Sequence, residues 1–215
     1  MTIKIREPGS AFTHLAAAVL VLFGAVPLLV KATLSNRTAL FAMVVFVISL
    51  LLLYGASTMY HSVNVGAKAL RLFRKFDHMM IFVLIAGSYT PVSLLVLPRE
   101  SGLPLFVAVW GIALAGMVFN LVWINCPKWV SSVIYIAMGW ACVPVIGALY
   151  TILPRAAFLW LLAGGIIYTA GGVVYALKPG AFNEKHPYFG SHEIFHLFVM
   201  GGSFCHFIFM LVYVL

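Results

Sequence analysis

The chain has 215 residues, of which 64% are hydrophobic and only 8% are charged. Soluble globular proteins carry roughly 25% charged residues, so this composition excludes an ordinary soluble domain and predicts a protein whose solvent is mainly lipid. The formal net charge is +8, but the sequence shows no recognisable nucleic-acid-binding module. The basic residues stand in short gaps between apolar runs. We therefore interpret them as topology signals and contacts for anionic lipid head groups, with no nucleic acid as partner.

Seven charge-free stretches divide the chain. A helix needs about 20 apolar residues to cross a hydrocarbon layer of roughly 30 Å, and each stretch supplies them. Because the backbone finds no water inside lipid, the stretches are expected to be helices. The predicted fold is all-α: a polytopic membrane protein in which 1–215 form a single seven-helix transmembrane domain, with a short cytoplasmic N-terminal segment, 1–13. The expected spans are 14–30, 39–60, 78–97, 104–125, 130–150, 157–177 and 192–214.

The distribution of lysine and arginine predicts the orientation of the bundle. Cytoplasmic connections of membrane proteins carry an excess of these residues. Nine lie on the side of the N-terminus and four on the other side, so the N-terminus is expected in the cytoplasm and the C-terminus outside. The nine are Lys4, Arg6, Lys68, Arg71, Arg74, Lys75, Lys128, Lys178 and Lys185, and the four are Lys31, Arg37, Arg99 and Arg155.

Four ionisable residues are expected at the cytoplasmic ends of their helices. His61 ends the second span, Asp77 begins the third, and His192 and His196 begin the seventh. Such groups are costly at membrane depth and usually functional. The i, i+4 spacing of the last two histidines places both imidazoles on one helix face, about 6 Å apart along the axis.

These residues predict a zinc site. His61, His192 and His196 are the expected ligands of Zn²⁺, with a water in the fourth position, as in catalytic zinc sites. Zinc would lower the pKa of that water toward ~7, and Asp77 would orient the water and accept its proton. Ser57 lies four residues before His61 on the same helix face. Its hydroxyl is either a supporting hydrogen-bond partner of the site or bonded to a carbonyl of its own helix.

The other histidines have a simpler interpretation. A single histidine in a helix bundle is more often a hydrogen-bonded packing residue than a ligand, and this is the favoured reading of His78, His186 and His206. For His14 the two readings are balanced. His206 follows His196 by ten residues, roughly 15 Å along a helix, so it does not share an ion with His196 unless the helix breaks.

Residues 192–196 read His-Glu-Ile-Phe-His and match the HExxH motif of zinc proteases, in which the glutamate is the general base. An intramembrane metalloprotease using Glu193 is therefore an alternative. The extended form of the motif is missing, since Val199 and Gly202 stand at its later positions, and no acidic residue follows Glu193. A third ligand would have to come from upstream in the chain.

The combined motifs resemble the progestin and adiponectin receptor family, and most closely its bacterial hemolysin III-like branch. The resemblance rests on Ser57-x3-His61, on Asp77, on the run 192–196 and on the opening Glu7-Pro8-x4-Thr13-His14, in which Ser10 replaces an expected asparagine. It covers the chain from Glu7 to the last span. It implies a seven-helix fold in a bacterial plasma membrane with zinc near the cytoplasmic face, bound by the three histidines named above, and Asp77 holding the zinc-bound water.

The same resemblance implies several functions. Alkaline ceramidases belong to the wider superfamily, which implies hydrolysis of an amide or ester of an acyl lipid, and the bacterial branch is linked with membrane lipid homeostasis. We therefore expect a homeostatic membrane protein with hydrolase chemistry, whose partners are membrane lipids, including a fatty-acyl substrate. The alternatives are a receptor-like protein with structural zinc, a pore-forming cytolysin and the HExxH protease.

Overall fold

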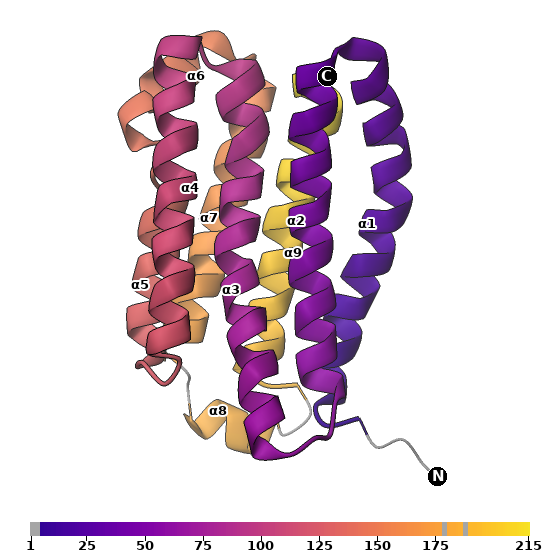
Figure 1. Ribbon diagram of the computed structural model, residues 1–215, viewed down its shortest axis with the longest axis vertical. Coiled ribbons are helices and arrows are strands. Elements are labelled where there is room, and N and C mark those ends of the chain that lie inside the picture. Colours follow the sequence, from indigo (N-terminus) through magenta and orange to yellow (C-terminus); the bar gives the residue numbers. More distant parts are fainter. Residues whose placement is uncertain (1–4, 178–179, 187–188) are drawn as a thin grey trace.

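The computed structural model describes residues 5–177, 180–186 and 189–215, and all regular structure in these ranges is helical. Seven helices are long and apolar enough to cross a membrane, so the predicted all-α, seven-span fold is confirmed (Figure 1). Helix α1 begins at one end of the bundle, and the C-terminus lies at the other. Lys4 and Lys178, two of the basic residues used to predict the orientation, lie outside the described residues.

Four spans are single uninterrupted α-helices, and three contain a change of helix type. The third and seventh spans continue into a π-helical turn, and the fifth is broken near its middle. A short helix, α8, lies outside the spans. The bounds are α1 Pro8–Ser35, α2 Arg37–Ser62, α3 Ala67–Pro91, η1 Val92–Val96, α4 Arg99–Val122, α5 Lys128–Gly139, η2 Val143–Val145, α6 Ile146–Ile152, α7 Arg155–Leu177, α8 Gly180–Lys185, α9 Ser191–Phe209 and η3 Met210–Val214.

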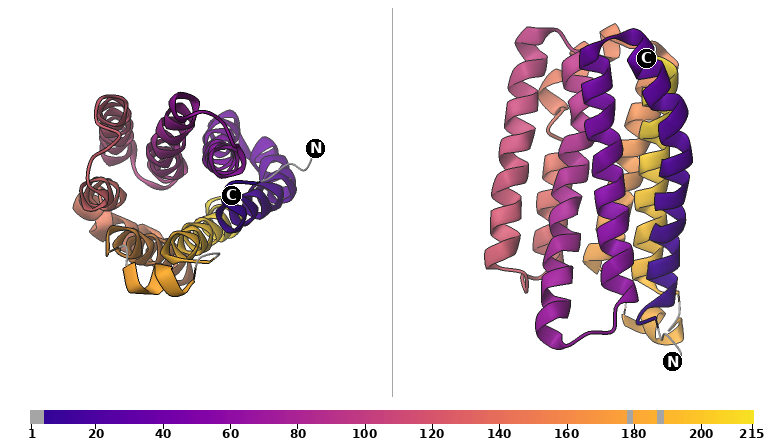
Figure 2. Two further views of the ribbon diagram at one scale, coloured as in Figure 1. Left: turned by 90° about the horizontal axis from the view of Figure 1, so that it is seen from below. Right: turned by 45° about the vertical axis from the view of Figure 1, so that its right-hand side comes forward.

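The helices form a ring in which each span contacts the next, and α9 closes the ring against α1. Figure 2 shows α2, α3 and α4 along one side of this ring and α7 and α9 on the other. The ring brings the beginning of α1, the end of α2, the beginning of α3 and the beginning of α9 to the same end of the bundle, which we call the N-terminal end. This arrangement follows from the alternating direction of successive spans.

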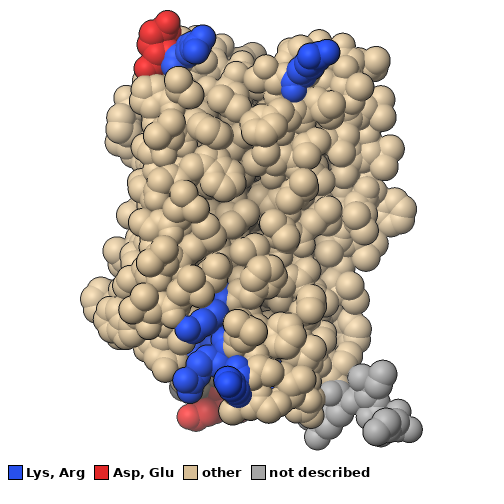
Figure 3. All heavy atoms as spheres, viewed as in Figure 1, with Lys and Arg blue, Asp and Glu red and all other residues tan. Residues whose placement is uncertain are grey.

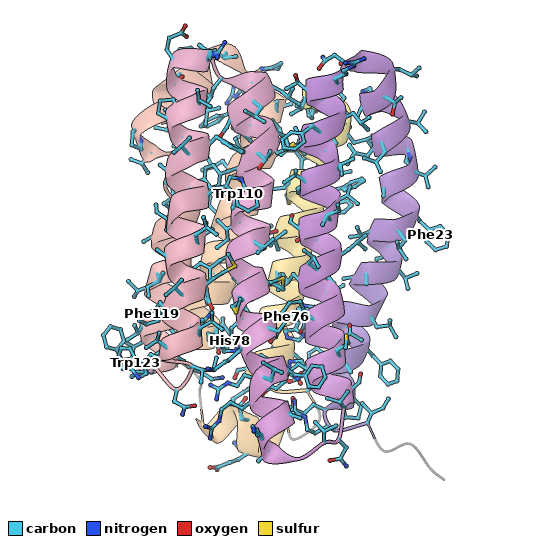
Figure 4. All side chains as sticks on the ribbon, in the orientation of Figure 1. Phe23, Phe76, His78, Trp110, Phe119 and Trp123 are labelled. Atoms are coloured by element: carbon cyan, nitrogen blue, oxygen red, sulfur yellow. The ribbon has the colours of Figure 1, made fainter. Side chains whose placement is uncertain are left out.

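The outer surface of the ring is apolar. Phe23 points outward from α1 (Figure 4) and is 75% exposed, and Val122 on α4 is 83% exposed. On the face shown in Figure 3, Lys, Arg, Asp and Glu lie near the two ends of the molecule and leave the band between them without charge. Apolar side chains are stable there because hydrocarbon is their solvent, and a charged group would be costly.

Several helix boundaries differ from the sequence prediction. The third helix begins at Ala67, whereas the expected span began at 78, because the helix continues through the basic residues of the connection; Asp77 therefore lies ten residues inside the helix and does not begin it. The first helix begins at Pro8, whereas the expected span began at 14, because polar residues of its first turns bond to other helices instead of to water. The fifth span ends its first helix at Gly139 and resumes at Ile146. The Tyr89 hydroxyl stabilises this break by donating to the Gly139 carbonyl at 2.6 Å and accepting the Cys142 N–H at 3.1 Å.

The close packing of α4 against η1 gives a test of the fold. A Cβ atom on Gly102 would overlap the backbone carbonyl of Ser93, whereas a Cβ on Gly111 would meet no atom within 4 Å. We expect Gly102→Ala to destabilise the protein by about 1–3 kcal/mol, because backbone cannot move aside as a side chain can.

The control, Gly111→Ala on the same helix, should be neutral or slightly stabilising, since alanine favours the helix. Thermal unfolding of both variants in detergent measures the difference. Equal melting temperatures would show that α4 and η1 are not packed as described.

Candidate metal centre

Three imidazoles meet at the N-terminal end of the bundle. His61 lies in the last turn of α2, and His192 and His196 lie in the first turns of α9. One nitrogen from each ring lies within 4.8 Å of the others. The structure therefore brings together the three predicted ligands, although 131 residues separate His61 from His192. Such a cluster can bind a metal ion.

The spacing of two of the three imidazoles fits a tetrahedral ion. The Nε2 atoms of His61 and His192 are 3.2 Å apart. A tetrahedral zinc ion with nitrogen ligands at about 2.05 Å separates those ligands by roughly 3.3 Å. Imidazole nitrogen is also a donor that zinc accepts readily. The donor set and the spacing of this pair thus suit zinc, and the third ligand atom lies within 4.8 Å of the other two.

Helix α1 orients two of the three rings through their other nitrogens. The Glu7 carboxylate bonds Nδ1 of His61, and the Thr13 hydroxyl bonds Nδ1 of His196 at 3.1 Å. Each bond leaves Nε2 of the ring available to a metal, and a carboxylate partner also makes the imidazole a better donor. The hydrogen bond with His61 lowers the pKa of Glu7, so this residue is a carboxylate at neutral pH.

The beginning of α1 is also attached to the ends of its neighbours. The Glu7 N–H donates to the His61 carbonyl at 3.0 Å, and the Arg6 guanidinium donates to the Tyr60 carbonyl at 2.7 Å. The same guanidinium lies 4.3 Å from the centre of the Tyr60 ring. These contacts fix the depth of α1 relative to the last turn of α2, so that Glu7 faces the ligand on that turn.

Glu193 acts as the cap of helix α9. One carboxylate oxygen accepts the hydroxyl of Ser10, and the other accepts the Gly190 N–H at 2.8 Å. Both oxygens are therefore engaged, and the residue bridges α1 to the beginning of the helix that bears two ligands. This role differs from that of a general base, which the HExxH interpretation requires. Ser10, at the position of the expected asparagine, still supplies the polar contact.

A cavity of about 130 Å³ begins beside the cluster and extends along the inside of the ring. Asp77 and Ser57 line it together with His192 and His196. The Asp77 carboxylate is buried and lies close enough to His61 and Ser57 to interact with both. The Ser57 hydroxyl is buried and lies beside that carboxylate. Most of the other lining residues are apolar.

The remaining histidines occupy different environments. The buried ring of His14 stacks on that of His196, with centroids 3.6 Å apart. His186, which directly follows α8, bonds the carbonyl of Phe182 in that helix. His78, labelled in Figure 4, lines the cavity. Helix α9 runs unbroken past His206, so that residue lies beyond the reach of the cluster.

The sequence reasoning missed the positioning roles of Glu7, Ser10 and Thr13. They were noted only as motif positions. A signal for them existed, because Ser10 and Thr13 are three residues apart on one face of a helix that begins at Pro8, and Glu7 directly precedes it. That signal could be read only once the start of α1 was known.

The orientation of the ligands gives a second prediction. Substituting Glu7→Gln or Thr13→Val should weaken metal binding by roughly 10–100-fold, because partners of the ligand imidazoles contribute that much. The control is Glu100→Gln, which changes an acidic residue in the first turn of α4 at the opposite end of the bundle. Competition with a chelator measures the metal affinity of the purified wild type and the three variants. Equal affinities in all four proteins would contradict the assigned roles.

Comparison with known proteins places the chain among relatives of similar length. A family model described as Haemolysin-III related matches residues 3–207. The chain is 36% identical to "Hemolysin-3" of Bacillus cereus over 211 residues, which are 98% of this chain and 92% of the relative. It is 35% identical to the "Hemolysin-3 homolog" of Bacillus subtilis (strain 168) over 213 residues, 99% of this chain and 95% of the relative.

A more distant similarity agrees with the resemblance to the receptor family. An "Adiponectin receptor protein" of Drosophila melanogaster is 28% identical over 178 residues, which are 68% of this chain and 35% of the relative. The family match spans the whole ring of helices, including every ligand of the cluster. The chain is therefore an integral membrane protein that belongs to the haemolysin-III-related family.

Proposed function

We propose that this protein is a zinc-dependent hydrolase that cleaves an amide or ester of an acyl lipid and thereby serves membrane lipid homeostasis. The observation that carries the proposal is the position of three imidazoles beside a buried carboxylate, Asp77, at the polar end of an apolar cavity. That combination offers a metal site, a group to handle a proton and a space for hydrocarbon.

The number of ligands favours catalysis over a structural role for the metal. Structural zinc sites usually have four protein ligands, whereas catalytic sites have three and an open position. The group of possible ligands found in the described ranges contains three residues, His61, His192 and His196. The open position would face the cavity, which two of these ligands line.

Each residue of the site has a distinct proposed task. When bound by the three imidazoles, zinc supplies a Lewis acid that lowers the pKa of a water toward ~7 and polarises a carbonyl. Asp77 holds the attacking water by a hydrogen bond and takes its proton. Ser57 orients that carboxylate through its hydroxyl. The apolar walls of the cavity hold the acyl chain and keep other water away from the scissile bond.

The proposed orientation places this chemistry at the cytoplasmic face of a bacterial plasma membrane. The excess of lysine and arginine at the N-terminal end supports it. Membrane lipids are then both the surroundings and the source of substrate. Two relatives are named for hemolysis, but a pore needs a polar stripe along several helices, and the described cavity is lined mainly by apolar side chains.

Metal content tests the first part of the proposal. We expect purified wild-type protein to contain nearly one zinc per chain and His192→Ala to lose it, because two imidazoles bind the ion far more weakly than three. His186→Ala is the matched control, since this exposed histidine bonds only the carbonyl of Phe182 in the described structure. Elemental analysis of the three proteins gives the answer. Wild-type protein without zinc would remove the basis of the proposal.

The assignment of the carboxylates is tested by activity. We expect Asp77→Asn to lower kcat for a fluorescent ceramide or acyl-ester substrate by about 100-fold or more, with zinc retained. Glu193→Gln should keep most activity, because the amide oxygen can still accept a hydrogen bond at the cap. The opposite result, loss with Glu193→Gln and retention with Asp77→Asn, would support the protease reading instead.

A further inference from the structure

Two cavities meet near the middle of the bundle. The first is the cavity that begins at the three imidazoles, and the second, of about 80 Å³, leads on toward α6 and the opposite end. Six residues line both cavities, and we call them the junction. They are Ser88, Tyr89, Gly139, Trp140, Gly165 and His206.

The broken fifth span helps to form the junction. Gly139 ends helix α5 and Trp140 lies in the non-helical turn that follows. Non-helical backbone at membrane depth is tolerated where it is buried in protein or lines a cavity, and broken spans often mark binding sites. The break in the fifth span is therefore one reason to regard the junction as a binding site. His206 gives a second, independent reason.

His206 carries a hydrogen-bond acceptor that has no partner. Its Nε2 contacts the carbonyl of Leu161 at 3.2 Å, and a carbonyl can only accept, so the proton of the neutral imidazole lies on Nε2. Nδ1 is then a lone-pair acceptor. It is buried and finds no hydrogen-bond partner in the described residues. A charged imidazole would be costly at this depth.

The packing of the ring shows which way this acceptor faces. A Cβ atom on Gly164 of α7 would touch Cδ2 and Nε2 of His206. That edge of the ring therefore faces α7. Nδ1 is the vertex opposite the Cδ2–Nε2 bond in a five-membered ring, so it points away from the contact with Gly164, on a side chain that lines both cavities.

The other polar side chains of the junction already have partners. The Tyr89 hydroxyl bonds backbone groups of the broken span, the Trp140 indole donates to Thr169 at 2.9 Å, and the Ser88 hydroxyl donates to the Leu84 carbonyl at 2.9 Å. Nδ1 of His206 is the polar side-chain atom of the junction that is left without one. An unpaired buried acceptor is unfavourable, so a donor on a bound molecule would be stabilised there.

We propose that the junction is a second binding site, which accepts a hydroxyl group carried in the middle of an otherwise apolar lipid chain. A hydroxyl supplies the O–H that Nδ1 requires, whereas a ketone or ether does not. The inference rests on the proposed function in one respect, namely that the polar head of the chain lies at the imidazole cluster.

The distance along α9 sets the position of the hydroxyl. His206 follows His196 by ten residues, or roughly 15 Å. With carbon–carbon bonds of about 1.5 Å, an extended chain advances roughly 1.3 Å per carbon, so the hydroxyl should lie about 12 carbons from the head group. The substrate class is thus an acyl lipid hydroxylated near mid-chain.

Binding of fatty acids, as analogues of the product, tests this site. Calorimetry on the purified full-length protein in detergent would compare an unsubstituted long-chain fatty acid with one hydroxylated about 12 carbons from its carboxylate. We expect the wild type to bind the hydroxylated acid about fivefold more tightly, the usual effect of one hydrogen bond. An acid hydroxylated next to its carboxylate should gain no such advantage. Equal binding of all three acids would overturn the proposal.

Two substitutions of His206 separate the acceptor from the packing of the ring. The amide nitrogen of His206→Gln can replace Nε2 and keep the bond to Leu161, but Nδ1 is lost, so the preference should disappear. The amide oxygen of His206→Asn lies near the position of Nδ1, so the preference should remain, although the bond to Leu161 is lost. The reverse pattern, or a preference that persists in His206→Gln, would overturn the proposal.

The same measurement keeps this inference distinct from the proposed function. Binding is measured without turnover. If the protein lacks zinc or hydrolytic activity but still binds the mid-chain hydroxylated acid more tightly in a way that depends on His206, the hydrolase proposal is wrong and the second site is supported. His192→Ala completes the comparison. If it weakens binding of all the acids equally and keeps the preference, the head group lies at the cluster and the hydroxyl at the junction.

Discussion

The absence of water inside a lipid bilayer is the constraint on which this structure depends. Every backbone and side-chain polar group within the bundle needs a partner from the protein itself. This requirement makes the spans helical, places Glu193 as a cap at the beginning of α9, and supplies the Tyr89 hydroxyl to the broken fifth span. The few polar atoms left without partners consequently stand out, and several belong to side chains that line the main cavity.

The first turns of α1 bind to both helices that carry the ligand imidazoles. Glu7 contacts the ring and backbone of His61 at the end of α2, while Ser10 and Thr13 contact Glu193 and His196 on α9. Three residues at the beginning of α1 thus hold two other helices in register. The match to the family model, over residues 3–207, includes these three residues as well as the two histidines of the cluster that lie on α9.

The cavities connect the chemistry of the cluster to the middle of the membrane. A carboxylate and imidazoles that can bind a metal lie at one end, apolar walls follow, and His206 lies where the second cavity begins. A long lipid chain is the kind of ligand that such a shape suits, since its ends and its middle can be recognised by different groups. Reactivity and selectivity would then depend on separate residues, about 15 Å apart along one helix.

The sequence by itself determined the number of spans and the depth of the ionisable residues. Apolar runs of sufficient length set the spans, and their alternating direction put His61, His192 and His196 at one end of the bundle, as the structure confirms, whereas Asp77 lies ten residues inside α3 and does not begin it. Hydropathy is a signal along the membrane normal, so it predicts depth and carries no information about which helices are neighbours.

Only the tertiary structure decided the lateral arrangement. That α2 and α9 bring their imidazoles within reach of one ion, that α1 begins early enough for Glu7 and Thr13 to orient them, and that His14 stacks on a ligand ring all follow from side-chain packing around the ring. The break after Gly139 and the unpartnered nitrogen of His206 also depend on tertiary packing. Packing depends on contacts between residues far apart in the chain, and no local pattern of residues records them.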